Sequence, residues 1–157
     1  MEKEVSGTSA DANEQFEFTL NLKNSSGSAL TDLYGYTIYS SDGSHYATGT
    51  IKSGDTFFLS NGQYIIVNYL PDGTVCTVME DPSDYTTTYT VNRGSEGTGT
   101  NASATISNGY TEVIHFVNTR DYALPSTGGS GTYLYTVVGV FLCGGAALLA
   151  YRRRKRV

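Results

Sequence analysis

A strict alternation of apolar and polar residues in the first part of the chain limits most strongly how it can fold. Between Phe16 and Leu22, every even-numbered residue is Phe or Leu and every odd-numbered residue is polar. Because side chains of a strand point alternately to its two faces, this period predicts a half-buried strand. No stretch of ten or more residues before Tyr133 has the helical period. The body of the chain is therefore predicted to be all-β.

Further short alternating runs, separated by turn signals such as Asn61-Gly62, extend this pattern. The expected strands are Phe16–Leu22, Tyr34–Ile38, Thr48–Ile51, Phe57–Leu59, Ile65–Val67, Val75–Glu80, Tyr85–Asn92 and Val113–Asn118. We expect His45 in a turn and Gly94–Asn101 in a glycine-rich loop. About seven short strands with regularly spaced turns predict an Ig-like β-sandwich.

The C-terminal part of the chain has a different pattern, an uncharged apolar segment followed by basic residues. Tyr133–Tyr151 holds 19 residues without a charge, close to the ~20 that cross a bilayer as a helix. Five basic residues, Arg152–Arg156, follow at once. By the positive-inside rule we predict a transmembrane helix with a cytoplasmic C-terminus and residues 1–132 outside. The alternative, a buried core helix, would carry polar residues at helical spacing.

The charge balance excludes some function classes. Residues 1–124 carry five basic residues against all 15 acidic ones, a net charge of −10. An acidic body argues against nucleic-acid binding, which needs a basic surface. The two cysteines cannot build a disulfide framework, and neither His45 nor His115 belongs to a catalytic motif. We therefore predict a non-enzyme that uses no cofactor and no metal.

The N-terminus carries no export signal. Met1 is followed by Glu2, Lys3 and Glu4 rather than by an apolar segment. Because the body is predicted to lie outside the cell, we expect that a signal peptide and further N-terminal domains are missing from this sequence.

The junction before the apolar segment carries the sharpest motif, Leu124-Pro125-Ser126-Thr127-Gly128. With the apolar segment and the basic tail it resembles the Gram-positive cell-wall sorting signal, Leu-Pro-x-Thr-Gly. The resemblance implies that a sortase cysteine attacks the Thr127 carbonyl and expels Gly128, and that an amine of the peptidoglycan precursor resolves the thioester. The protein would be the substrate, held by the membrane only as a precursor, and would end on the cell surface covalently attached to the wall.

Three segments of the body carry a second resemblance. They are Lys3–Gly7 with Phe16–Leu20, Leu70–Thr74 with Thr77–Glu80, and Ile114–Thr119. In this order they resemble the Cna B-type domains of Gram-positive pilins and adhesins. The resemblance implies an intramolecular isopeptide bond between Lys3 and Asn118, with Glu80 as the catalyst. The expected organisation is a Cna B-type sandwich at 1–121, a sorting-motif linker at 122–132, a transmembrane helix at 133–151 and a basic tail at 152–157.

Alternation gives modest independent support for this triad. Glu80 shares its strand face with Val78, Asn118 shares its face with Phe116, and Lys3 aligns with Val5. A buried polar group without a partner is costly, so the three would satisfy one another by meeting. Burial would favour a neutral lysine, a nucleophile toward the Asn118 carbonyl. Lys23 is the fallback nucleophile, although it ends its strand on the solvent side.

Two function classes remain open. The leading one is structural, a stalk or pilin-type domain of a wall-anchored surface protein. The alternative is an adhesin module that recognises a host or matrix ligand through exposed loops such as Gly94–Asn101. The predicted partners are a sortase and the peptidoglycan precursor, together with either pilin subunits or a host ligand.

Overall fold

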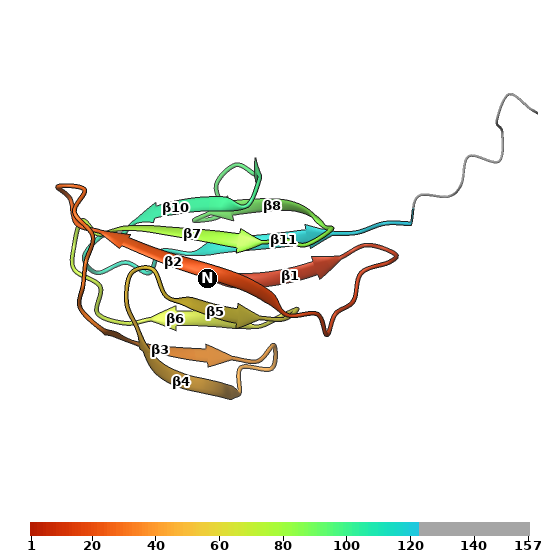
Figure 1. Cartoon of the computed structure of the whole chain (residues 1–157), viewed down its shortest axis with the longest axis horizontal. Helices are drawn as coiled ribbons and strands as arrows, with labels where there is room; N and C mark the ends of the chain where they lie inside the picture. Colours follow the sequence, from red (N-terminus) through yellow and green to blue (C-terminus); the bar gives the residue numbers. More distant parts are fainter. Residues whose placement is uncertain (123–157) are drawn as a thin grey trace, which may run out of the picture. The chain divides into compact units, whose positions relative to one another are not determined.

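A computed structural model describes residues 1–122 of the 157-residue chain. In this part the chain forms eleven strands and no helix, so it contains no helix long and apolar enough to cross a membrane (Figure 1). Residues Met1–Tyr122 form one compact unit. The predicted sorting motif and membrane segment lie outside the described residues.

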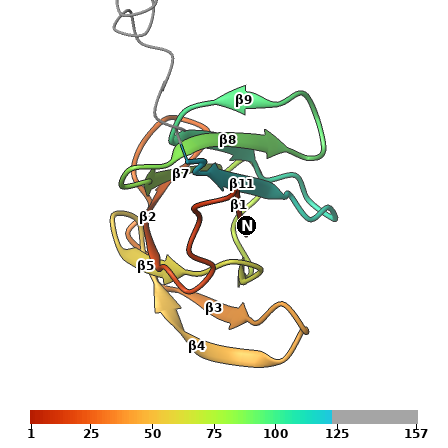
Figure 2. The same cartoon turned by 90° about the vertical axis from the view of Figure 1, so that its right-hand side faces the viewer.

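The strands form two sheets, which confirms the all-β prediction. The seven-stranded sheet has the order β4 (His45–Ile51), β3 (Tyr34–Tyr39), β6 (Tyr64–Val67), β1 (Glu2–Ser6), β11 (Ile114–Thr119), β8 (Thr86–Val91) and β9 (Gly97–Thr98). The four-stranded sheet has the order β10 (Asn101–Thr105), β7 (Val75–Asp81), β2 (Phe16–Lys23) and β5 (Thr56–Leu59). In Figure 2, β3 and β4 lie at one end of the larger sheet and β8 and β9 at the other.

The first and last strands are neighbours in the middle of the larger sheet. Strand β1 runs parallel to β11, with Lys3 opposite Phe116 and Val5 opposite Asn118. On its other side β1 pairs with β6 only at Glu2, opposite Tyr64. Strand β8 pairs antiparallel with the far side of β11. The two strands that are farthest apart in sequence are therefore joined directly by backbone hydrogen bonds.

The hydrophobic core lies between the two sheets. Strand β2 buries Phe16, Phe18, Leu20 and Leu22 on one face, as its alternation predicts. The Phe18 ring stacks on Phe57 at 5.5 Å between centroids and meets Phe116 of the opposite sheet at 5.6 Å. The Phe18–Phe57 contact joins neighbouring strands of one sheet, and the Phe18–Phe116 contact joins the two sheets across the core.

The structure corrects three details of the predicted pattern. His45 is not in a turn but begins β4 opposite Tyr39, where the register shifts at an irregularity between Ile38 and Tyr39. The sequence between Gly94 and Asn101 is not wholly a loop, because β9 pairs there with β8. Strand β10 was not predicted, since its two core residues, Ala102 and Ala104, are too small to give a clear hydrophobic signal.

Candidate functional site

Lys3 lies in the hydrophobic core, although lysine is almost never buried without a partner. Only 2% of the residue is exposed. Its Nζ lies 2.7 Å from Glu80 Oε1. It also lies 4.3 Å from the centroid of the Phe16 ring and 5.9 Å from that of Phe18. The amine is thus held between aromatic rings and one carboxyl group.

Glu80 reaches the same point from the other sheet. It lies on β7 opposite Phe18 of β2, and it is 6% exposed. Within the described part of the chain its second oxygen, Oε2, has no hydrogen-bond partner. Burial raises the pKa of the Glu80 carboxyl and lowers the pKa of the Lys3 amine, while their mutual contact opposes both changes. Desolvation is the larger effect on each, so it shifts both groups toward their neutral forms.

Asn118 completes the arrangement from β11, with no exposed surface. Its Nδ2 donates a hydrogen bond of 3.0 Å to Glu80 Oε1, the same oxygen that contacts Lys3 Nζ. Its Oδ1 accepts a hydrogen bond of 2.9 Å from Thr87 Oγ1. Both polar atoms of the buried amide are therefore satisfied, as the cost of burial requires.

Thr87 was missed by the sequence analysis. It lies on β8 directly opposite Asn118 and is 5% exposed. The signal was available, because Thr87 falls between Tyr85 and Tyr89 on the apolar side of the alternation. Threonine is common on both faces of strands, however, and a single one does not indicate a site.

The four side chains bring an amine, a carboxyl, a carboxamide and a hydroxyl together away from water. One carboxyl oxygen contacts both nitrogens, so a proton can pass from Nζ to Nδ2 through a single group. The arrangement suits acyl transfer from Asn118 to Lys3.

The other predicted candidates lie apart from this cluster. Lys23 is exposed at the end of β2. His115 faces outward, with Nε2 3.3 Å from Glu4 Oε2. The Cys76 thiol is free, and burial raises its pKa to about 11. Within residues 1–122, no group of His, Cys, Asp and Glu side chains is suited to hold a metal.

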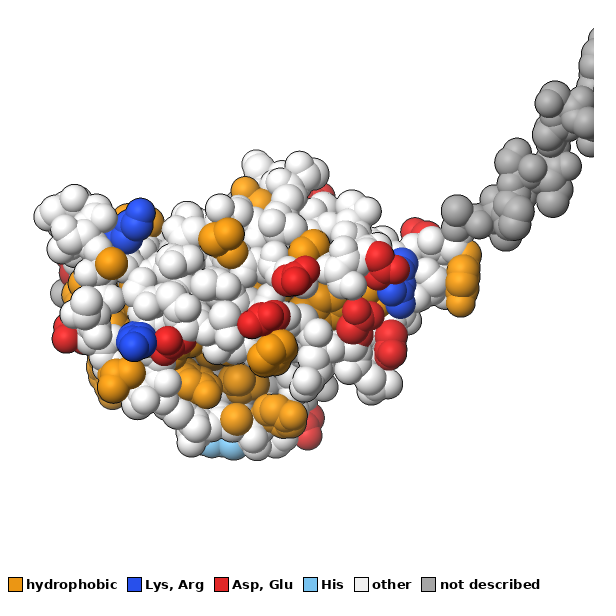
Figure 3. Space-filling model, viewed as in Figure 1, with side chains coloured by type: hydrophobic (Ala, Val, Ile, Leu, Met, Phe, Trp, Pro, Cys, Tyr) orange, Lys and Arg blue, Asp and Glu red, His pale blue; other side chains and the backbone are white. Residues whose placement is uncertain are grey.

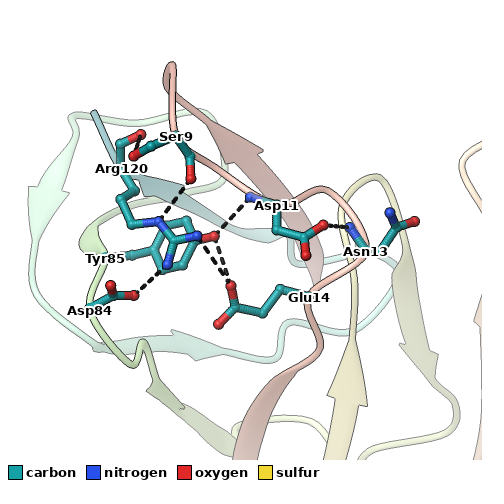
Figure 4. Close-up of polar contacts among 7 residues, drawn as sticks. All are labelled: Ser9, Asp11, Asn13, Glu14, Asp84, Tyr85 and Arg120. Atoms are coloured by element: carbon teal, nitrogen blue, oxygen red, sulfur yellow. Dashed lines mark hydrogen bonds and ion pairs between the residues drawn. The ribbon is translucent and has the colours of Figure 1, made fainter. Parts of the chain in front are cut away.

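A second polar cluster holds the end of β11 (Figure 4). Its members, here called the Arg120 cluster, are Ser9, Asp11, Glu14, Asp84, Tyr85 and Arg120. The Arg120 guanidinium lies 4.3 Å from the centroid of the Tyr85 ring and donates hydrogen bonds to Ser9 O at 3.0 Å and to Asp84 Oδ1 at 2.7 Å. In Figure 3 several acidic side chains surround a basic one at this end of the domain. The loop after β1 and the loop before β8 are thereby fastened to β11.

The comparisons with known proteins agree with this fold. The crystal structure of the major pilin from Streptococcus pyogenes superimposes with a TM-score of 0.65 at 26% identity, over 76% of this chain and 46% of that one. A mutant form of the pilus-presented adhesin Cpa gives 0.57 at 25% identity, over 76% and 26%. The pilus tip adhesin Cpa of Streptococcus pyogenes is 31% identical over 126 residues, which are 79% of this chain and 17% of that protein. The chain thus spans less than half the length of each of these relatives.

Residues 122–157 match the LPXTG cell wall anchor motif. Together with the pilin-like fold, this match defines the class: a pilin-like surface protein attached to the Gram-positive cell wall. Residues 1–120 match the model of a domain of unknown function, DUF7601, and the chain belongs to that family.

Proposed function

We propose that this protein is a structural stalk of the cell surface, in which one pilin-like domain is closed by a Lys3–Asn118 isopeptide bond and fastened to peptidoglycan by a sortase. The observation that carries the first part is the contact of Lys3 Nζ and Asn118 Nδ2 with the same buried Glu80 oxygen. Three polar side chains from β1, β7 and β11 converge in a core that is otherwise lined by aromatic rings.

The chemistry follows from that convergence. A neutral Lys3 amine attacks Asn118 Cγ, Glu80 shuttles one proton from Nζ to Nδ2, and ammonia leaves. Proximity supplies much of the acceleration, because oriented intramolecular reactions reach effective molarities of ~10⁵–10⁸ M. The amide formed joins β1 to β11 covalently.

Intact mass tests the bond. The purified chain is expected to be lighter than its sequence by about 17 Da, the mass of the ammonia released in the acyl transfer. Lys3→Arg, Glu80→Ala and Asn118→Ala should each restore the unreacted mass. Two matched controls, Lys23→Arg on β2 and Glu17→Ala on its outward side, should keep the loss. An unshifted mass for the folded unaltered chain would contradict the proposal.

The second part of the proposal concerns the anchor. We propose that residues 122–132 link the domain to a transmembrane helix at 133–151 and a cytoplasmic basic tail at 152–157, and that these hold the precursor at the membrane. A sortase then cleaves between Thr127 and Gly128 and transfers the Thr127 acyl group to a wall-precursor amine. The match to the LPXTG anchor motif supports this step.

Anchoring is tested in Gram-positive cells that contain an active sortase. Wall hydrolases are expected to release a protein whose last residue is Thr127, joined to a peptidoglycan fragment that mass spectrometry identifies. Thr127→Ala should leave the chain extractable by detergent alone. Ser126→Ala, at the variable position of the motif, is the control and should still be anchored. Detergent extraction of the unaltered protein in an uncut form would refute the anchoring step.

A second candidate function is an adhesin module, which the 31% identity to a pilus tip adhesin favours. That similarity covers 17% of the adhesin, and so concerns one domain rather than the whole protein. A host or matrix ligand would bind through exposed loops around Gly94–Asn101. The two candidates are separated by measuring adhesion of cells whose protein carries a replaced Gly94–Asn101 segment, since a stalk would keep its anchoring and lose no adhesion.

A further inference from the structure

We propose that Thr87 is a catalytic residue of isopeptide formation: its hydroxyl donates the hydrogen bond that stabilises the negative charge developing on Asn118 Oδ1. This inference rests on the proposed function, because it assigns a role within the same reaction.

The geometry fits an oxyanion donor. Thr87 Oγ1 donates to Asn118 Oδ1 over 2.9 Å, and both residues are buried. Effective donors of this kind lie about 2.7–3.1 Å from the oxygen that gains charge. Among the hydrogen bonds of residues 1–122, Thr87 is the one donor to Oδ1, while the other side of the amide is occupied by Glu80.

The donor is held in position before the reaction begins. Thr87 faces Asn118 directly in the antiparallel pair of β8 and β11. Its carbonyl oxygen accepts a backbone hydrogen bond of 3.0 Å from Gly99 N, which ties this part of β8 on its other side. A β-branched side chain has few rotamers in a strand, so little reorganisation is needed when charge develops.

The negative charge on Asn118 Oδ1 arises when Lys3 Nζ attacks and disappears when ammonia leaves. The Nζ lone pair forms a bond to Cγ, and the carbonyl π electrons move to Oδ1. Glu80 gives its proton to Nδ2 and takes one from Nζ, so it ends as the acid it was. The Cγ–Nδ2 bond then breaks, the carbonyl re-forms and NH₃ leaves.

Charge on Oδ1 exists only between attack and collapse. Because the site is buried among aromatic rings, water does not solvate that charge, and a fixed donor is worth more than it would be in water. The hydroxyl already bonds Oδ1 before the reaction, and it lowers the barrier because this hydrogen bond strengthens as the oxygen gains charge.

The test compares rates of ammonia loss. Full-length chains are isolated in urea from inclusion bodies, diluted into detergent-containing buffer to start folding, and followed by intact mass. Removing one oxyanion donor lowers rates by roughly 10²–10³-fold, and we expect this effect for Thr87→Val, which keeps the shape of the side chain. Thr87→Ser retains the hydroxyl and should stay near the unaltered rate. Thr86→Val, at the exposed neighbour on β8, is the matched control and should react normally.

Two further measurements separate catalysis from structure. In a Glu80→Ala background, where no bond forms, hydrogen exchange of β8 and β11 measures how far Thr87→Val loosens these strands by leaving Asn118 Oδ1 unpaired. Rates are then compared at a temperature where both strands stay protected in the variant. The hydroxyl itself does not titrate, but its hydrogen bond lowers the pKa of the Glu80 carboxyl. Thr87→Val should therefore shift the pH profile and also lower its maximum rate, and the loss of maximum rate measures the oxyanion donor.

A Thr87→Val rate equal to that of the unaltered chain overturns the role of Thr87 while leaving the isopeptide bond intact. A maximum rate equal to that of the unaltered chain at a shifted pH optimum also overturns it, because it would assign the effect to a disturbed Lys3–Glu80 pair. Absence of ammonia loss from the unaltered chain instead overturns the proposed function itself.

Discussion

At the scale of single residues, the properties of Lys3, Glu80 and Asn118 depend on their burial away from water. Lys3 and Glu80 would form an ordinary ion pair in water, but both are buried between the sheets. Desolvation disfavours both charged forms, and the contact at 2.7 Å only partly offsets it. In the proposed reaction the pair would share one proton, which leaves the amine neutral and able to attack.

The reaction should depend on pH through this pair. Below its lower apparent pKa a second proton makes Lys3 an ammonium ion, which has no lone pair. Above its higher apparent pKa Glu80 is a carboxylate, which has no proton for the leaving nitrogen. We expect a bell-shaped rate profile whose two midpoints belong to the pair rather than to either residue.

The profile is measured by diluting urea-unfolded chains into buffers of different pH and following the intact mass. Folding is monitored in parallel by circular dichroism on the Glu80→Ala variant, which reports pH effects on folding alone. A rate that rises with pH without a descending limb would mean that Glu80 does not act as the acid.

At the scale of strands and loops, the close approach of the loop after β1 to the end of β11 depends on one glycine. Gly7 follows β1 with φ +102°, and a Cβ built there would lie 2.3 Å from the Arg120 carbonyl oxygen. The backbone N–H of Arg120 donates to Ser6 O at 3.1 Å, and the Thr8 N–H donates to Asp121 Oδ1 at 2.8 Å. The close approach lets the loop and the end of β11 bond to each other and brings Ser9 to the Arg120 cluster.

Gly7→Ala should therefore destabilise the domain more than a positive φ alone explains. Gly27 is the matched control, because it has φ +84° and a Cβ there would meet nothing within 4 Å. The left-handed conformation costs about 1–2 kcal/mol for an L-residue, which is the expected loss for Gly27→Ala. Gly7→Ala adds a backbone clash and should cost clearly more, as measured by urea unfolding in the Glu80→Ala background. Equal losses for the two variants would show that the contact with Arg120 relaxes freely.

The same elements show how far the sequence predicts this fold. Strong alternation of large residues predicted β2 almost to its ends, since each of its core positions is Phe or Leu. Strand β10 could not be predicted in this way, because its core residues Ala102 and Ala104 are too small to contrast clearly with their polar neighbours. Glu80 and Asn118 could be assigned to the core side by counting from Val78 and Phe116, and both are buried.

Thr87 could not be found in the same way. Its importance depends on which residue of β11 lies opposite it, and that register is set by pairing between strands that the sequence does not specify. The same limit applies to the Arg120 cluster, where residues from three separate parts of the chain meet only in the folded domain.

At the scale of the whole molecule, a wall-attached protein carries tension along its chain. With the proposed bond, a load would pass from Met1 to Lys3, across the amide, and from Asn118 to Tyr122. Residues 4–117 would lie outside this path and would not be stretched. The Arg120 cluster would hold the last residues of the path against the domain.

Single-molecule pulling from both ends of the chain measures this directly. The unaltered domain should not lengthen on unfolding, whereas Glu80→Ala should release residues 4–117, a gain on the order of 400 Å at ~3.3–3.6 Å per residue. Glu17→Ala should behave as the unaltered domain does. A release of the same length from the unaltered domain would mean that no covalent link bridges the path.

The parallel pairing of β1 with β11 also sets the order of events during biosynthesis. Lys3 is synthesised before its partner strand, which is the last strand of the described domain, so nearly the whole domain must be made before the two strands can meet. A chain that ends before β11, or that misfolds, cannot form the proposed Lys3–Asn118 bond. The proposed bond would thus form only in molecules whose domain has been completely synthesised and folded, and its presence would distinguish them from fragments.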